Sequence, residues 1–135
     1  TPAQQELVEK VSKNIYRPCC DNATYFPDCN HGMAMLGLLE LMAAQGANET
    51  EIYQAALKVN SYWFPNEYAN IAQFLKSKNI DWAMVSPEKL LGFGISAGSA
   101  YQQITAQLAQ TTSSQGSGCG IGDGNPPQES SSCAP

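Results

Sequence analysis

The chain has 135 residues, a length that suits one domain, and 43% of them are hydrophobic, which is enough to fill a core. Seven basic residues are scattered among twelve acidic ones, so the net charge is −5 and no cation cluster is available to bind phosphates. Nucleic acid is therefore excluded as an expected partner. No apolar run approaches the ~20 residues that cross a bilayer, which predicts no transmembrane segment.

The first residue bears on where the protein is located. Thr1 is neither an initiator methionine nor the start of a basic and then apolar leader. We expect either a mature exported chain whose signal has been removed or a domain of a longer protein. The expected location is extracytoplasmic, in the periplasm, at the cell surface or secreted.

Helical periodicity begins near the N-terminus. Leu7, Val8 and Val11 recur at helical spacing, and Pro18 ends the pattern. Residues 17–31, RPCCDNATYFPDCNH, contain two prolines and no sustained periodicity, which predicts an ordered loop.

A second helix is expected over 28–44, which is apolar on nearly all sides and therefore buried. Asp28 is the expected N-cap and Gly46 the expected stop. Asn48 and Glu51 have the spacing of a capping box, which opens the next helix.

Further helices follow in the second half. Ser86 and Pro87 form a typical N-cap and first-turn pair, and Gly92 is expected to stop that short helix. No alternating strand pattern is found, so the predicted fold class is all-α, a small bundle of five or six helices with a Gly/Ser/Pro-rich C-terminal tail. The expected helices are 4–16, 28–44, 48–62, 66–78, 86–91 and 96–110.

The tail differs in composition from the rest of the chain. Residues 111–135 have one large aliphatic side chain and many Gly, Ser and Pro, so they cannot bury a core of their own. We therefore divide the chain into a helical cysteine-site domain, 1–110, and a tail, 111–135. Cys119 and Cys133 are expected to be joined by a disulfide or to form part of a second site, and only contacts outside the tail could order it.

The most informative residues lie in the predicted loop. Cys19, Cys20 and Cys29 are three of the five cysteines, and they lie close to His31, the only histidine. Three thiols and one imidazole are a common ligand set for a soft or borderline metal ion. At a helix start, Cys29 would also gain thiolate character from the helix dipole. Zinc or copper is favoured and iron is possible, although adjacent cysteines do not easily bind one ion together.

Other interpretations of these residues remain open. Cys29 could form a disulfide with Cys19 or Cys20, or the adjacent pair could form a vicinal disulfide. Met35 and Met42 share a helix face with His31, which suits copper ligation or, as we favour, core packing. The aromatic group at 62–64 and Tyr68 either shields a site or forms a helix crossing.

Several catalytic motifs are missing from the sequence. It has no Cys-x-x-Cys pair, no haem-attachment motif, no His-Glu-x-x-His helix and no phosphate-binding loop. The sequence thus favours a non-enzymatic, exported metal-binding protein. The alternative is a structural or assembly subunit of an extracellular or cell-surface polymer, stapled by disulfides to copies of itself or to another exported protein.

Residues 17–65 resemble the bacterial extracytoplasmic family named for its Pro-Cys-Tyr-Cys-Gly-Cys (PCYCGC) motif. The matching pieces are Pro18-Cys19-Cys20, Asp28-Cys29 and the stretch from Gly46 to Ile52. The spaced cysteines of that motif are an adjacent pair in this chain, and the tail cysteines have no counterpart. The resemblance implies an exported protein with a cysteine site.

Overall fold

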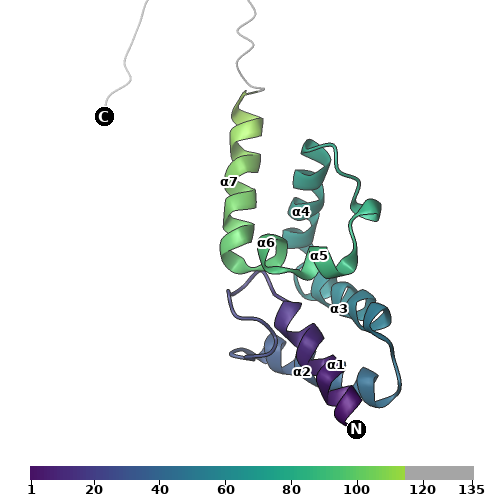
Figure 1. Ribbon diagram of the computed structural model, residues 1–135. Coiled ribbons are helices and arrows are strands. Elements are labelled where there is room, and N and C mark those ends of the chain that lie inside the picture. Colours follow the sequence, from purple (N-terminus) through teal and green to yellow (C-terminus); the bar gives the residue numbers. More distant parts are fainter. Residues whose placement is uncertain (115–135) are drawn as a thin grey trace, which may run out of the picture.

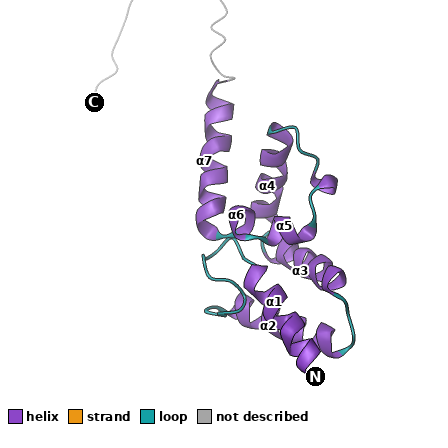
Figure 2. Cartoon of the chain, viewed as in Figure 1, coloured by secondary structure: helices purple, strands orange, loops and turns teal. Residues whose placement is uncertain are grey.

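A computed structural model describes residues 1–114, and within them the fold is all-α, as predicted. It has seven α-helices, five of them with at least seven residues, and one short 3₁₀ helix, with no strand in this part of the chain (Figure 2). The elements are α1 (Pro2–Asn14), α2 (Asn30–Ala44), α3 (Glu49–Trp63), α4 (Pro65–Ser77), η1 (Trp82–Met84), α5 (Pro87–Leu91), α6 (Phe93–Ser96) and α7 (Gly98–Ser114).

The helices form two layers that meet at α3, α5 and α6. Helices α1 and α2 pack side by side, and α3 contacts both of them (Figure 1). Helices α4 and α7 pack side by side in the other half, and the short helices α5 and α6 connect the halves. The loop between α1 and α2, which carries the cysteines, lies next to the first turn of α7.

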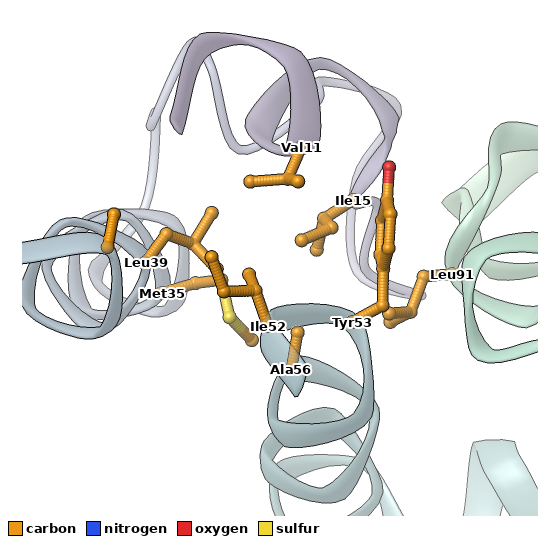
Figure 3. Packing of buried hydrophobic residues seen from close by; sticks show 9 residues of the cluster. Val11, Ile15, Met35, Leu39, Ile52, Tyr53, Ala56 and Leu91 are labelled. Atoms are coloured by element: carbon orange, nitrogen blue, oxygen red, sulfur yellow. The ribbon is translucent and has the colours of Figure 1, made fainter. Parts of the chain in front are cut away.

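The core beside this loop is apolar and drawn from α1, α2, α3 and α5. Met35 is fully buried there, which confirms its predicted role in packing, and Met42 packs against the same cluster. Figure 3 shows the side chains converging on one point between the helices. The cluster consists of Val11, Ile15, Met35, Leu39, Ala43, Ile52, Tyr53, Ala56 and Leu91.

A second apolar cluster lies between α4 and α7, and one polar side chain connects it to the first. Asn60 is fully buried, and its Nδ2 donates to the Tyr16 carbonyl at 2.9 Å and to the Tyr68 hydroxyl at 3.1 Å. The Tyr68 hydroxyl in turn lies 2.6 Å from Ser96 Oγ. The second cluster consists of Tyr68, Ile71, Leu75, Leu90 and Ile104.

These helix ends follow the sequence signals with two differences. The capping box of Asn48 and Glu51 is present, and Gly46 has a positive φ of 85° after α2. The N-cap of α2 is Cys29, not Asp28. Gly92 does end α5, but it also begins α6, a helix that the sequence did not indicate.

The last helix extends beyond its predicted end. It continues to Ser114, so residues 111–114, which we expected in the tail, are helical. The predictions for Cys119 and Cys133 concern residues outside the described part of the chain.

Candidate metal centre

The cysteine loop is fixed to the end of α1 by hydrogen bonds around a buried threonine. The backbone N–H of Thr24 donates to the Ile15 carbonyl at 2.9 Å, and its hydroxyl donates to the same oxygen at 2.9 Å. The next residue, Tyr25, donates its N–H to the Ser12 carbonyl at 3.0 Å. These bonds tie the middle of the loop to the end of α1. The segment between them, which carries Cys19 and Cys20, is thereby held in one place.

The adjacent cysteines occupy a tight turn. Residues 17–20 form this turn, with the Cys20 N–H donating to the Arg17 carbonyl at 3.3 Å. Pro18 takes the second position, where its fixed φ suits a turn. The two thiols are therefore side by side, with 3.0 Å between Cys19 Sγ and Cys20 Sγ.

The start of α7 supports the turn from the far end of the sequence. Gly98 donates its N–H to the Cys20 carbonyl at 2.9 Å, and Ser99 donates its N–H to the Asp21 carboxylate at 2.8 Å. A Cβ at Gly98 would lie 3.1 Å from the Cys20 nitrogen, closer than a side chain is usually tolerated. The close approach thus favours glycine at this position.

The structure gathers the predicted ligands into two overlapping groups that share Cys29. Cys19, Cys29 and His31 form one group, and Cys20, Asp28 and Cys29 form the other, with all ligand atoms of a group within 4.8 Å of one another. The sequence pattern predicts only a helix-capping role for Asp28, which the structure places in the second group. The groups together form a Cys/His/Asp cluster that can bind a metal ion.

The three cysteines of the described chain are free thiols. None of the predicted disulfides of Cys29 or of the adjacent pair is formed among residues 1–114. Cys29 is the N-cap of α2, and the Gly32 N–H donates to its sulfur at 3.4 Å. The thiol therefore lies where the helix N-terminus stabilises negative charge.

His31 is held by the aromatic residues at the end of α3. Its ring centroid lies 5.0 Å from that of Trp63 and 5.0 Å from that of Phe64. The predicted aromatic group therefore does contact the candidate ligands, although Tyr62 is 88% exposed and points away. Met33, two residues after His31, is also exposed.

A fully buried arginine, which the sequence analysis missed, lies beneath the thiols. Arg17 Nη2 donates to Cys20 Sγ at 3.4 Å, to the Asn22 carbonyl at 3.3 Å and to Asp28 Oδ1 at 3.3 Å. Its Nη1 donates to Thr24 Oγ1 at 3.1 Å. The only carboxylate that pairs with it in the described chain, Asp28, is 41% exposed. The buried guanidinium is therefore also stabilised by neutral acceptors, the Thr24 hydroxyl and the Asn22 carbonyl, and by the neighbouring cysteines where they ionise.

Two sequence signals could have revealed Arg17. It is the only arginine of the chain, and it directly precedes Pro18-Cys19-Cys20. Gly32 is the second signal, because a Cβ there would lie 3.1 Å from Arg17 Nη2. Only the folded chain shows that these two residues meet.

The charges of the site influence one another. Burial opposes ionisation of Cys29, but the Gly32 N–H and Arg17 outweigh it, so the pKa of Cys29 lies below its ordinary value. Burial and the Cys20 thiol raise the pKa of Cys19 to about 12. Burial opposes the charge of Arg17 as well, yet the neighbouring thiols raise its pKa, so the guanidinium stays charged.

Comparison with family models, curated proteins and solved structures gives no match. The resemblance to the Pro-Cys-Tyr-Cys-Gly-Cys family therefore stays a prediction. Among the described helices, none combines the length and apolar character needed to cross a membrane.

Proposed function

We propose that this protein is an exported, non-enzymatic domain that holds a soft metal ion in its Cys/His cluster, with Cys19, Cys20, Cys29 and His31 as candidate ligands. The observation that carries the proposal is the grouping of thiol and imidazole atoms within 4.8 Å while the cysteines are free. Thiolate and imidazole ligands suit zinc and Cu(I), and iron is a third choice.

The surroundings of the cluster support this proposal. A metal ligand must be deprotonated, and Cys29 lies at a helix N-terminus beside a buried guanidinium, where the thiolate is favoured. The imidazole of His31 is oriented by two aromatic rings. Both features lower the cost of arranging the ligands before the ion arrives.

Metal stoichiometry and free-thiol counting on the reduced protein test this function. We expect the wild-type protein to bind zinc or Cu(I) and to lose thiol reactivity in proportion. Cys29→Ser should abolish binding, because Cys29 belongs to both groups. The matched control is the double variant Cys119→Ser/Cys133→Ser, which removes the two cysteines beyond the described residues and should keep the metal. Absence of bound metal in reduced wild-type protein would contradict the proposal.

A structural or assembly role is the second proposal, favoured by the exposed Cys19 thiol. An exposed thiol can form a disulfide with another chain in an oxidising compartment. Electrophoresis without reductant distinguishes the roles: a ladder of linked species that Cys19→Ser removes supports assembly, and a single monomer band supports a metal carrier.

A further inference from the structure

We infer that the site takes Cu(I) in a three-coordinate arrangement of Cys19, Cys29 and His31, and that Arg17 determines this specificity by occupying Cys20 and Asp28. The inference rests on the proposed metal-binding function and deepens it. It names the ion, the coordination number and a residue that touches the ligands without being one.

The two ligand groups differ in what already binds them. Cys20 Sγ and Asp28 Oδ1 both accept hydrogen bonds from Arg17 Nη2, at 3.4 and 3.3 Å. Asp28 Oδ2 also accepts from the Asn22 amide at 2.8 Å. An ion bound between Cys20 and Asp28 would lie against a guanidinium that donates to both. The other group also contains Cys29, but its two remaining members are Cys19 and His31 instead of Cys20 and Asp28.

Arg17 cannot move away to make room for a second cation. It is fully buried, and Thr24 Oγ1 and the Asn22 carbonyl accept from its two terminal nitrogens. Gly32 lies directly against it, since a Cβ there would lie only 3.1 Å from Arg17 Nη2. The positive charge is therefore a fixed part of the site.

A fixed positive charge discriminates between ions by their charge. The repulsion on a divalent ion is twice that on a monovalent ion at the same position. Structural zinc also takes four ligands almost without exception, whereas the group without Cys20 and Asp28, the two side chains that accept from Arg17 Nη2, offers three. Soft Cu(I) is satisfied by two or three sulfur and nitrogen ligands, so both charge and coordination number favour it.

X-ray absorption spectroscopy of the Cu(I)-loaded wild-type protein tests the ligand set. We expect a three-coordinate edge and a first shell of two sulfurs and one nitrogen. A first shell of three sulfurs would place Cys20 on the ion and overturn the inference. This measurement needs no substitution, so it does not depend on how a variant folds.

Competition with chromophoric chelators tests the role of Arg17, with Cu(I) and Zn(II) measured separately. Arg17→Gln should raise Zn(II) affinity relative to Cu(I) by about tenfold or more, because the charge is gone and two further ligands are released. Lys10→Gln is the matched control, since it removes one exposed positive charge that pairs with Glu49 and not with a candidate ligand. An unchanged ratio in folded Arg17→Gln would overturn the inference.

The outcomes separate the inference from the function on which it rests. Tight four-coordinate zinc in the wild-type protein would overturn the inference and leave the metal-binding function standing. Failure of the reduced wild-type protein to bind either ion would overturn both.

Discussion

The cysteine loop and the α4–α7 pair are held together by different forces. The loop, residues 15–29, is fixed by hydrogen bonds to a buried arginine, to the Ile15 carbonyl and to the first turn of α7. The α4–α7 pair is held by apolar side chains such as Ile71 and Ile104, which are almost fully buried. The candidate site therefore depends on directional hydrogen bonds, whereas the second half of the molecule depends on buried apolar area.

Directional bonds leave the loop sensitive to single atoms. Arg17 donates with both terminal nitrogens, yet its Nε is buried without a partner. The Oδ1 atom of Asn60, the residue that joins the two halves, is likewise buried without a hydrogen-bond partner. A buried polar atom without a partner costs ~1–3 kcal/mol. Removing a further hydrogen bond from Arg17 or Asn60 would add to this cost and lower the free energy of unfolding.

The largest expected effect lies in the apolar half. Ile71→Ala should lower the free energy of unfolding by ~2–5 kcal/mol, because it leaves a cavity where the side chain is fully buried. The metal affinity of the folded protein should stay unchanged, since Ile71 belongs to the second apolar cluster, which contains none of the candidate ligands. Urea unfolding and metal titration measure the two quantities. A loss of affinity in the folded state would show that the two regions are not separate.

A smaller but more local effect is expected in the loop. Thr24→Val should lower the free energy of unfolding by ~1–3 kcal/mol, because it removes the acceptor of Arg17 Nη1 and the donor to the Ile15 carbonyl. Unlike Ile71→Ala, it should also weaken metal binding, since the guanidinium and the thiols shift together. Thr105→Val on α7 is the control, because the hydroxyl of that half-buried threonine donates to the Gln102 carbonyl of its own helix and lies on a different element from the loop. Unchanged metal affinity in Thr24→Val would contradict the link between loop bonds and site geometry.

The same contrast explains what could be predicted from the sequence. Helices α1 to α4 and α7 follow from apolar spacing, and the caps at Asn48 and Ser86 follow from local chemistry. These are interactions between near neighbours. Helix α6 has four residues between glycines, too few for any periodic signal.

The candidate site was predictable in its residue types and not in its geometry. Four candidate ligands within a short stretch indicated a cluster, and the structure gathers them, with Asp28, into two groups that share Cys29. The support from Gly98 and Ser99 comes from 78 residues away, and no local pattern encodes it. The buried state of Arg17 was likewise hidden, because an arginine in a loop is usually exposed.

Two glycines of α2, Gly32 and Gly37, provide a matched pair of substitutions within one helix. Gly32→Ala should destabilise the fold and weaken metal binding, because its Cβ would lie 3.1 Å from both Arg17 Nη2 and the Pro27 Cα. Gly37→Ala meets nothing within 4 Å and should stabilise the protein by about 1 kcal/mol through helix propensity alone. Thermal unfolding of the two variants gives the difference. Equal shifts would mean that the arginine yields easily, which would weaken the argument for a fixed charge.

The smallest expected effect is the order in which the thiols react in the metal-free protein. By exposure alone, Cys19 should react with iodoacetamide before the half-buried Cys29. The pKa values predict the opposite order, because the pKa of Cys19 is raised to about 12 and that of Cys29 is lowered. At neutral pH the thiolate fraction, and hence the alkylation rate, should be larger at Cys29.

Peptide mass mapping after brief alkylation at pH 7 resolves the order. We expect the label first on Cys29, with a rate that falls as the pH drops, since protonation removes the nucleophile. Arg17→Lys keeps a positive charge but loses the planar donor fork, so the preference for Cys29 should shrink without disappearing. If Cys19 were labelled first at neutral pH, exposure would outweigh the guanidinium and the helix N-terminus. The charge of Arg17 would then be compensated by Asp28 and not by the thiols, and the loop would resemble an ordinary ion pair more than a thiolate site.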